Sequence, residues 1–106
     1  MRRIIDGKRY DTTTATEICD VSGTGGHLSR TDFKWEDTTL YRTQRGRFFV
    51  AGEGGPMSRW VVSCGDNSWT GGSGIQAIDE AEARELVERF GSAETYEQTF
   101  GAAEPA

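Results

Sequence analysis

The stretch TTLYRTQRGRFFVAGEGGPMSRWVVS, residues 38–63, decides the fold that this sequence predicts. Within it, two strand-like segments, residues 40–43 and 47–51, flank a short polar loop that contains Gly46. Glycine readily adopts the positive φ that tight hairpin turns require. The pattern therefore predicts a β-hairpin at the centre of the fold.

The turn leaves the register of this hairpin open. A three-residue loop would place Tyr41 opposite Phe49, whereas a two-residue loop would place it opposite Val50. Beyond the hairpin, the glycine-rich residues 52–56 should end the pairing. Residues 60–62, Trp-Val-Val, predict the next strand, because aromatic and β-branched side chains suit a pleated surface.

The N-terminal part predicts a hairpin followed by a helix. Residues 4–10 form two short strand-like runs around an Asp-Gly turn pair at residues 6–7. Apolar and small residues then recur at helical spacing over residues 15–22, with Thr14 or Asp11 as alternative N-caps. We therefore expect a short helix that ends at the glycine-rich loop beyond it.

The C-terminal part predicts two helices. Asp79 has capping-box spacing to Glu82, and an apolar stripe at helical period follows up to Gly91, a natural helix stop. Ser92 can cap a second short helix. Residues 101–106 predict a flexible tail.

Together these segments predict a single α+β domain over residues 1–100. A small antiparallel sheet of three to five strands should pack with the N-terminal helix and the acidic C-terminal helices. The side chains expected in the core are Tyr41, Phe48 or Phe49, Val50, Trp60, Val62, Ile78, Leu86, Val87 and Phe90.

The chain of 106 residues carries a net charge of −5, which is unevenly spread. From residue 79 onward, eight acidic and two basic residues give −6, while the first 78 residues sum to +1. This distribution argues against a general affinity for nucleic acid and favours a protein partner with a basic surface. The sequence contains neither the ~20 apolar residues of a membrane span nor a signal peptide, so we expect a cytoplasmic protein with no membrane partner.

No pattern in the chain matches a catalytic or cofactor-binding signature. The glycine clusters at residues 23–26, 52–55 and 71–74 lack the residues that complete a phosphate loop or a dinucleotide fingerprint, although a backbone anion nest stays open. His27 could pair with a cysteine as base and nucleophile, but no cysteine-enzyme signature is present. We therefore expect no enzyme activity, no cofactor and no metal.

Two alternative functions rest on other groups. A phosphate-binding or nucleic-acid-binding module would use the hairpin tip, with Arg42, Arg45, Arg47 and Arg59. A small hydrolase would use Cys64, or the carboxylates of Asp32, Glu36 and Asp37.

The leading candidate surface is the outer face of the acidic helix at residues 79–89, because its apolar stripe is committed to the core. An exposed tryptophan in a polar loop is a further candidate, since rigid aromatic side chains often anchor interfaces. The residues expected to contact a partner are Glu80, Glu82, Glu85, Glu88, Trp69, Asp32, Glu36 and Asp37.

Three segments carry a resemblance to known proteins. IDGKRYDT (residues 5–12) with TA (residues 14–15), LYRTQRGRFF (residues 40–49) and GEGG (residues 52–55) resemble segments of small uncharacterised bacterial proteins, often carried on phages, plasmids or integrative elements. The similarity extends to about residue 100 and assigns no functional residues. Some small acidic proteins of mobile elements block host defences such as CRISPR nucleases, so the resemblance implies an anti-CRISPR-like role.

We therefore expect a non-enzymatic interaction protein of a mobile element. It would inhibit a host defence complex of the CRISPR type by protein–protein binding through its acidic surface. The oligomeric state is left open.

Overall fold

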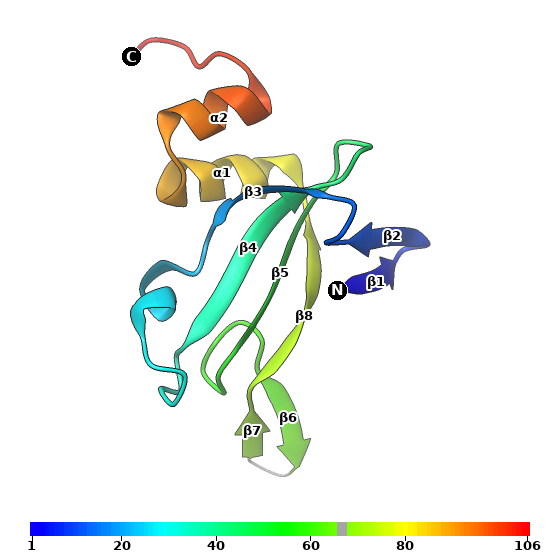
Figure 1. Cartoon of the computed structure of the whole chain (residues 1–106), viewed down its shortest axis with the longest axis vertical. Coiled ribbons are helices and arrows are strands. Elements are labelled where there is room, and N and C mark those ends of the chain that lie inside the picture. Colours follow the sequence, from blue (N-terminus) through cyan, green and yellow to red (C-terminus); the bar gives the residue numbers. More distant parts are fainter. Residues whose placement is uncertain (66–67) are drawn as a thin grey trace.

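The computed structural model describes residues 1–65 and 68–106, apart from the side chain of Cys64. Its centre is a four-stranded antiparallel sheet in the order β3-β4-β5-β8, with two helices packed at one end and the β1-β2 hairpin at one side (Figure 1). The protein is therefore α+β, as predicted. The elements are β1 Arg2–Ile5, β2 Lys8–Asp11, β3 Thr16–Asp20, the 3₁₀ helix η1 Gly23–His27, β4 Glu36–Arg42, β5 Phe48–Gly54, β6 Val62–Gly65, β7 Ser68–Thr70, β8 Gly72–Ile78, α1 Glu80–Phe90 and α2 Ala93–Phe100.

The central hairpin of β4 and β5 uses the three-residue loop. Tyr41 lies opposite Phe49, and Gly46 supplies the left-handed corner with a φ of 85°. The prediction that residues 52–56 end the pairing is wrong for residues 52–54, which continue β5. Gly52 permits this because a Cβ there would collide with the neighbouring strand.

The predicted helix at residues 15–22 is wrong, because this segment contains the edge strand β3. A β-bulge between Glu17 and Cys19 shifts the register against β4. As a result Ile18 and Cys19 both pack toward the same core cluster, and this produces the apolar spacing that imitates a helix. The N-cap candidate Asp11 instead closes a turn, accepting a hydrogen bond from the backbone N–H of Thr13 at 2.9 Å.

The predicted strand at residues 60–62 is wrong for Trp60 and Val61, and only Val62 lies in a strand. Trp60 lies in a turn, is only 5 % exposed, and donates from Nε1 to the hydroxyl of Thr38 at 2.8 Å. The strand next to β5 is β8, while Val62 starts the separate β6-β7 hairpin. Val62 is 48 % exposed and is not a core residue.

The sheet separates two clusters of apolar side chains. The larger lies toward the helices and the smaller lies under the β1-β2 hairpin. Buried members of the larger cluster are Val21, Leu40, Phe48, Val50, Trp60, Ala83 and Val87. Buried members of the smaller one are Tyr10, Phe49, Ala51 and Ile75. Of the predicted core, Tyr41, Ile78, Leu86 and Phe90 are half-buried and pack against these clusters.

Both C-terminal helices begin at their predicted caps. The side chain of Asp79 accepts from the backbone N–H of Glu82, and that of Ser92 accepts from Thr95. Residues 101–106 are exposed and contain no helix or strand. Among the described residues, no helix is long and apolar enough to cross a membrane.

Candidate functional site

One groove of about 660 Å³ lies between α1, α2 and the C-terminal residues. Three carboxylates line it, those of Glu88, Glu97 and Glu104, and Arg84 is the one basic residue in its lining. We call this the acidic groove. It combines a concave shape with an excess of negative charge, which is what the side chains of a basic partner require.

The charge of Arg84 is directed into the contact between the two helices. Its Nη1 donates to the hydroxyl of Tyr96 at 3.0 Å, and its guanidinium lies 4.8 Å from the ring centre of Phe100. The hydrogen bond with Tyr96 is the main cause that raises the pKa of Arg84. Arg84 therefore holds α2 against α1, and its charge already interacts with Tyr96, Phe100 and Glu80.

The four glutamates predicted on α1 do not form one face. Glu80 and Glu85 pair with the arginines one turn later, at 3.4 and 3.8 Å. Glu82 and Glu85 line a smaller groove of about 230 Å³ that also contains two arginines. Of the four, only Glu88 lines the acidic groove.

Sequence reasoning missed two members of the acidic groove, Glu97 and Glu104. Both contribute to the net charge of −6 that follows residue 78. Their convergence depends on how α2 folds back on α1 and on the path of the residues beyond it (Figure 1). The segregated charge was therefore visible in the sequence, whereas the groove was not.

The other predicted contact residues lie elsewhere in the molecule. Trp69 is 58 % exposed on β7, at the end of the sheet opposite the helices (Figure 1). Asp32 lies in a turn rather than at the start of a strand and accepts from the backbone N–H of Lys34 at 2.9 Å. Adjacent positions on β4 place Glu36 and Asp37 on opposite faces of the sheet.

These positions do not assemble a hydrolase centre from the three predicted carboxylates. Glu36 is instead engaged by Arg59, whose Nε lies 2.9 Å from its Oε2. Within residues 1–65 and 68–106, no group of three or more His, Cys, Asp or Glu side chains is arranged to hold a metal. Burial raises the pKa of the Cys19 thiol, which keeps it protonated, and the predicted nucleophile Cys64 has a side chain outside the described part.

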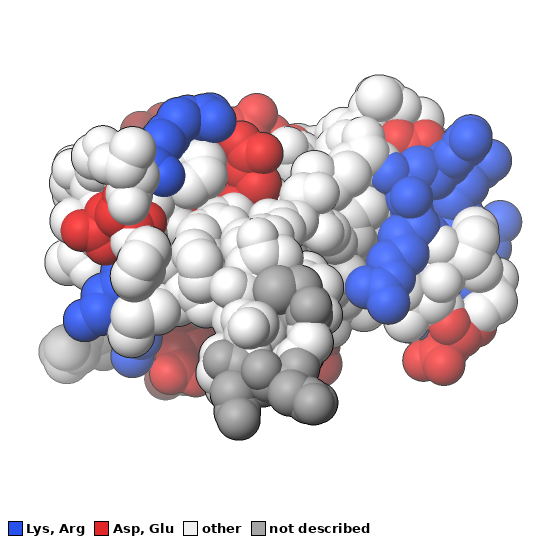
Figure 2. Space-filling view, turned by 90° about the horizontal axis from the view of Figure 1, so that it is seen from below, with Lys and Arg blue, Asp and Glu red and all other residues white. Residues whose placement is uncertain are grey.

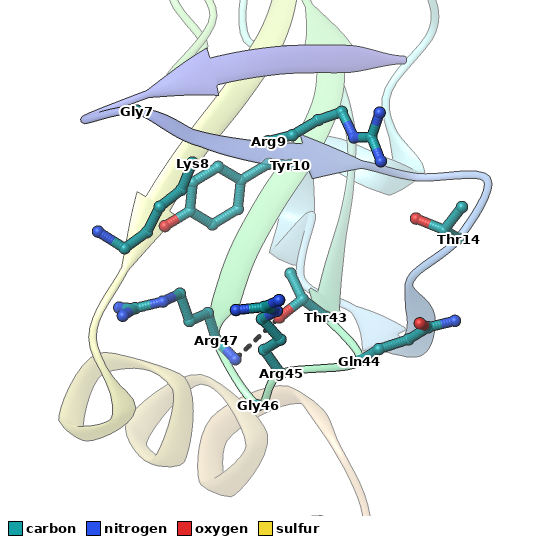
Figure 3. Close-up of a pocket in the computed structure, with 10 residues that line it drawn as sticks. All are labelled: Gly7, Lys8, Arg9, Tyr10, Thr14, Thr43, Gln44, Arg45, Gly46 and Arg47. Carbon is teal, nitrogen blue, oxygen red and sulfur yellow. Dashed lines mark hydrogen bonds between the residues drawn. The ribbon is translucent and has the colours of Figure 1, made fainter.

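A second groove, of about 680 Å³, lies between the β1-β2 hairpin and the loop that joins β4 to β5 (Figure 3). We call this the basic groove. Basic side chains also gather on the side of the molecule where the β1-β2 hairpin lies (Figure 2). The residues that line the basic groove are Gly7, Lys8, Arg9, Tyr10, Thr14, Thr43, Gln44, Arg45, Gly46 and Arg47.

Only part of the predicted arginine cluster lies in the basic groove. Arg45 and Arg47 line it, while Arg42 donates to the carbonyl oxygen of Thr99 at 3.2 Å on the helix side. Arg59 is held by Glu36 and by the carbonyl oxygen of Val21. The sequence pattern missed Lys8 and Arg9, which complete the groove from a distant part of the chain.

No protein family, curated protein or solved structure matches this chain. The features of the protein that indicate a function are the two grooves and the charges that line them.

Proposed function

We propose that this protein works by binding, and that its acidic groove docks on a basic surface of a partner protein. The observation that carries this proposal is the convergence of Glu88, Glu97 and Glu104 on one groove. The single lining cation, Arg84, already donates to Tyr96 and Glu80. The three carboxylates therefore keep an excess of negative charge that Arg84 does not neutralise, and this excess would attract a lysine or arginine of the partner.

The chemistry of the groove indicates the kind of partner. Surfaces rich in Lys and Arg are those that hold nucleic-acid phosphates, so a protein docked there would compete with nucleic acid. Long-range attraction would accelerate association at low salt and weaken as salt is added. Together with the resemblance to mobile-element proteins, this favours inhibition of a cytoplasmic host defence complex of the CRISPR type.

A capture experiment with matched variants tests the proposal. Tagged protein is incubated with bacterial host lysate at low and at physiological salt, beside the variant Glu88→Gln/Glu97→Gln/Glu104→Gln. The control, Glu17→Gln/Asp37→Asn/Glu53→Gln, removes the same formal charge from the sheet. We expect a nucleic-acid-binding complex to be retained by the wild type and the control and lost by the groove variant.

The purified complex then provides a functional measurement. Its nuclease or DNA-binding activity should fall in proportion to the protein added and stop falling at saturation, because inhibition by binding is stoichiometric. Equal capture by both triple variants, or capture of no such complex at either salt concentration, would contradict the proposal. Inactivation of many complexes by one molecule would instead indicate catalysis.

A further inference from the structure

We propose that the basic groove binds the phosphate backbone of a nucleic acid without reading its sequence. This inference is independent of the acidic groove, because it uses different residues and a ligand of opposite charge. Lys8 and Arg9 line it from β2, while Arg45 and Arg47 line it from the β4-β5 loop. In Figure 3, Arg45 extends from the loop toward β2, and the side chains of Lys8 and Arg47 extend to the same side of the groove. The Arg9 side chain points to the other side of β2.

The cations of this groove have no carboxylate partner among the described residues. None of the ten residues that line it is acidic. The ion pairs formed within residues 1–65 and 68–106 use Arg30, Arg59, Arg84 and Arg89, which all lie outside it. The nearby carboxylate of Asp11 is occupied by the backbone N–H and hydroxyl of Thr13. The unpaired charges of Lys8, Arg45 and Arg47 therefore favour an anionic ligand with several charges.

Both walls of the groove are held in place by the fold. In the loop, the backbone N–H of Arg47 donates to the hydroxyl of Thr43 at 3.0 Å, and Gly46 donates to the carbonyl oxygen of Thr43 at 2.9 Å. On the hairpin side, Arg3 donates to the carbonyl oxygen of Ile75 in β8 at 2.9 Å. The backbone on both sides of the groove is therefore anchored, and only the exposed side chains have to be ordered when a ligand binds.

The lining also indicates which part of the nucleic acid is contacted. The one aromatic side chain, Tyr10, is only 6 % exposed and packs edge-on against Phe49 with ring centres 5.5 Å apart. It is therefore not free to stack on a base, which is the usual platform for single strands. Thr14, Thr43 and Gln44 add hydrogen-bonding groups suited to phosphate and sugar oxygens. We expect backbone contacts that are tolerant of sequence and sensitive to salt.

The net charge of −5 does not exclude such a site. Exposed charges further apart than a Debye length, about 8 Å at physiological salt, are largely screened from one another. A ligand inside the groove is therefore governed mainly by the cations that line it. The acidic helices weaken the interaction most at low salt, where screening is least.

Fluorescence anisotropy with a labelled 20-base-pair DNA duplex of mixed sequence tests the site between about 50 and 200 mM NaCl. We expect dissociation constants in the range of about 10⁻⁶ to 10⁻⁴ M, and a log–log salt slope of roughly −0.9 for each phosphate contacted. The variants are Lys8→Gln/Arg9→Gln and Arg45→Gln/Arg47→Gln. The control Arg30→Gln/Arg89→Gln removes the same charge from two exposed ion pairs outside the groove.

Each groove variant should lose about tenfold or more in affinity and flatten the salt slope, while the control changes affinity by less than about threefold. Circular dichroism verifies that every variant is folded. Equal losses in groove and control variants, or no binding by the wild type at 50 mM NaCl, would overturn the proposal. Competition by tripolyphosphate as effective as that of the oligonucleotide, at equal phosphate concentration, would overturn the nucleic acid as ligand and indicate a small polyphosphate.

Discussion

The two faces of the central sheet are covered by different kinds of structure. Two helices cover the face with Leu40, where α1 and α2 carry the acidic groove. The β1-β2 hairpin covers part of the face with Phe49, and it carries one wall of the basic groove. The buried side chains under both layers are almost entirely apolar. Surface charge and sheet stability should therefore respond to different substitutions.

The largest expected effect compares the two buried clusters directly. Leu40 and Phe49 are both 0 % exposed, on opposite faces of the hairpin. Through lost burial and the cavity left behind, the free energy of unfolding should fall by about 2–5 kcal/mol for Leu40→Ala and by about 3–5 kcal/mol for Phe49→Ala. Urea denaturation measures both, with exposed Phe33→Ala as the control. A loss near 1 kcal/mol for Phe49→Ala would show that the hairpin closes its face only loosely.

A smaller effect should come from the polar group buried on the helix side. The hydroxyl of Thr38 accepts from Trp60 Nε1 at 2.8 Å and donates to Glu36 at 2.6 Å. Thr38→Val keeps the shape but leaves the indole N–H without its acceptor, so we expect a loss of about 1–3 kcal/mol. Thr39→Val, on the opposite face of β4, is the matched control in the same denaturation experiment. Equal losses for the two would contradict a role for this hydrogen bond.

The helix caps should contribute less to the free energy of unfolding than the buried hydrogen bond of Thr38. Asp79→Ala and Ser92→Ala each remove the side-chain acceptor of a first-turn N–H and should cost about 1 kcal/mol. For Ser92→Ala, the loss should be accompanied by weaker binding of a basic partner, because Ser92 begins the helix that supplies Glu97. Thermal unfolding and partner titration measure the two effects. An unchanged melting temperature for both variants would contradict the observed caps.

The local features of the fold could be predicted from the sequence, and the long-range ones could not. The sequence predicts the roles of Gly46, Asp79 and Ser92 correctly, because a turn or a cap depends on residues close in the chain. It predicts a helix where β3 lies, because the bulge in β3 turns Ile18 and Cys19 toward the same core. The spacing of apolar residues along the sequence is the same for a bulged strand of this kind and for one face of a helix.

Trp60 and the basic groove show a second limit of the sequence. The strand-like composition around Trp60 was overridden by a buried hydrogen bond to Thr38, 22 residues away. Arg45 belongs to a basic loop that the sequence predicts, but Lys8 completes its groove from a hairpin held by the packing of Tyr10 on Phe49 and by the hydrogen bond from Arg3 to Ile75. Such neighbours depend on tertiary packing, which no local pattern contains.

The smallest expected effect concerns an exposed ion pair on α1 and tests whether such pairs stabilise the fold. Glu85 and Arg89 form an i,i+4 pair at 3.8 Å, with side chains 71 % and 66 % exposed. Arg89→Gln should therefore cost only about 0.2–0.5 kcal/mol, and less as salt is added. Denaturation at low and high salt measures this. Arg59→Gln would leave the mostly buried Glu36 without its arginine partner and should cost more. If Arg89→Gln cost as much, the ion pairs of α1 would hold the helix in place. A small cost would show that the Glu85–Arg89 pair adds little to stability, in contrast to the buried Glu36–Arg59 pair.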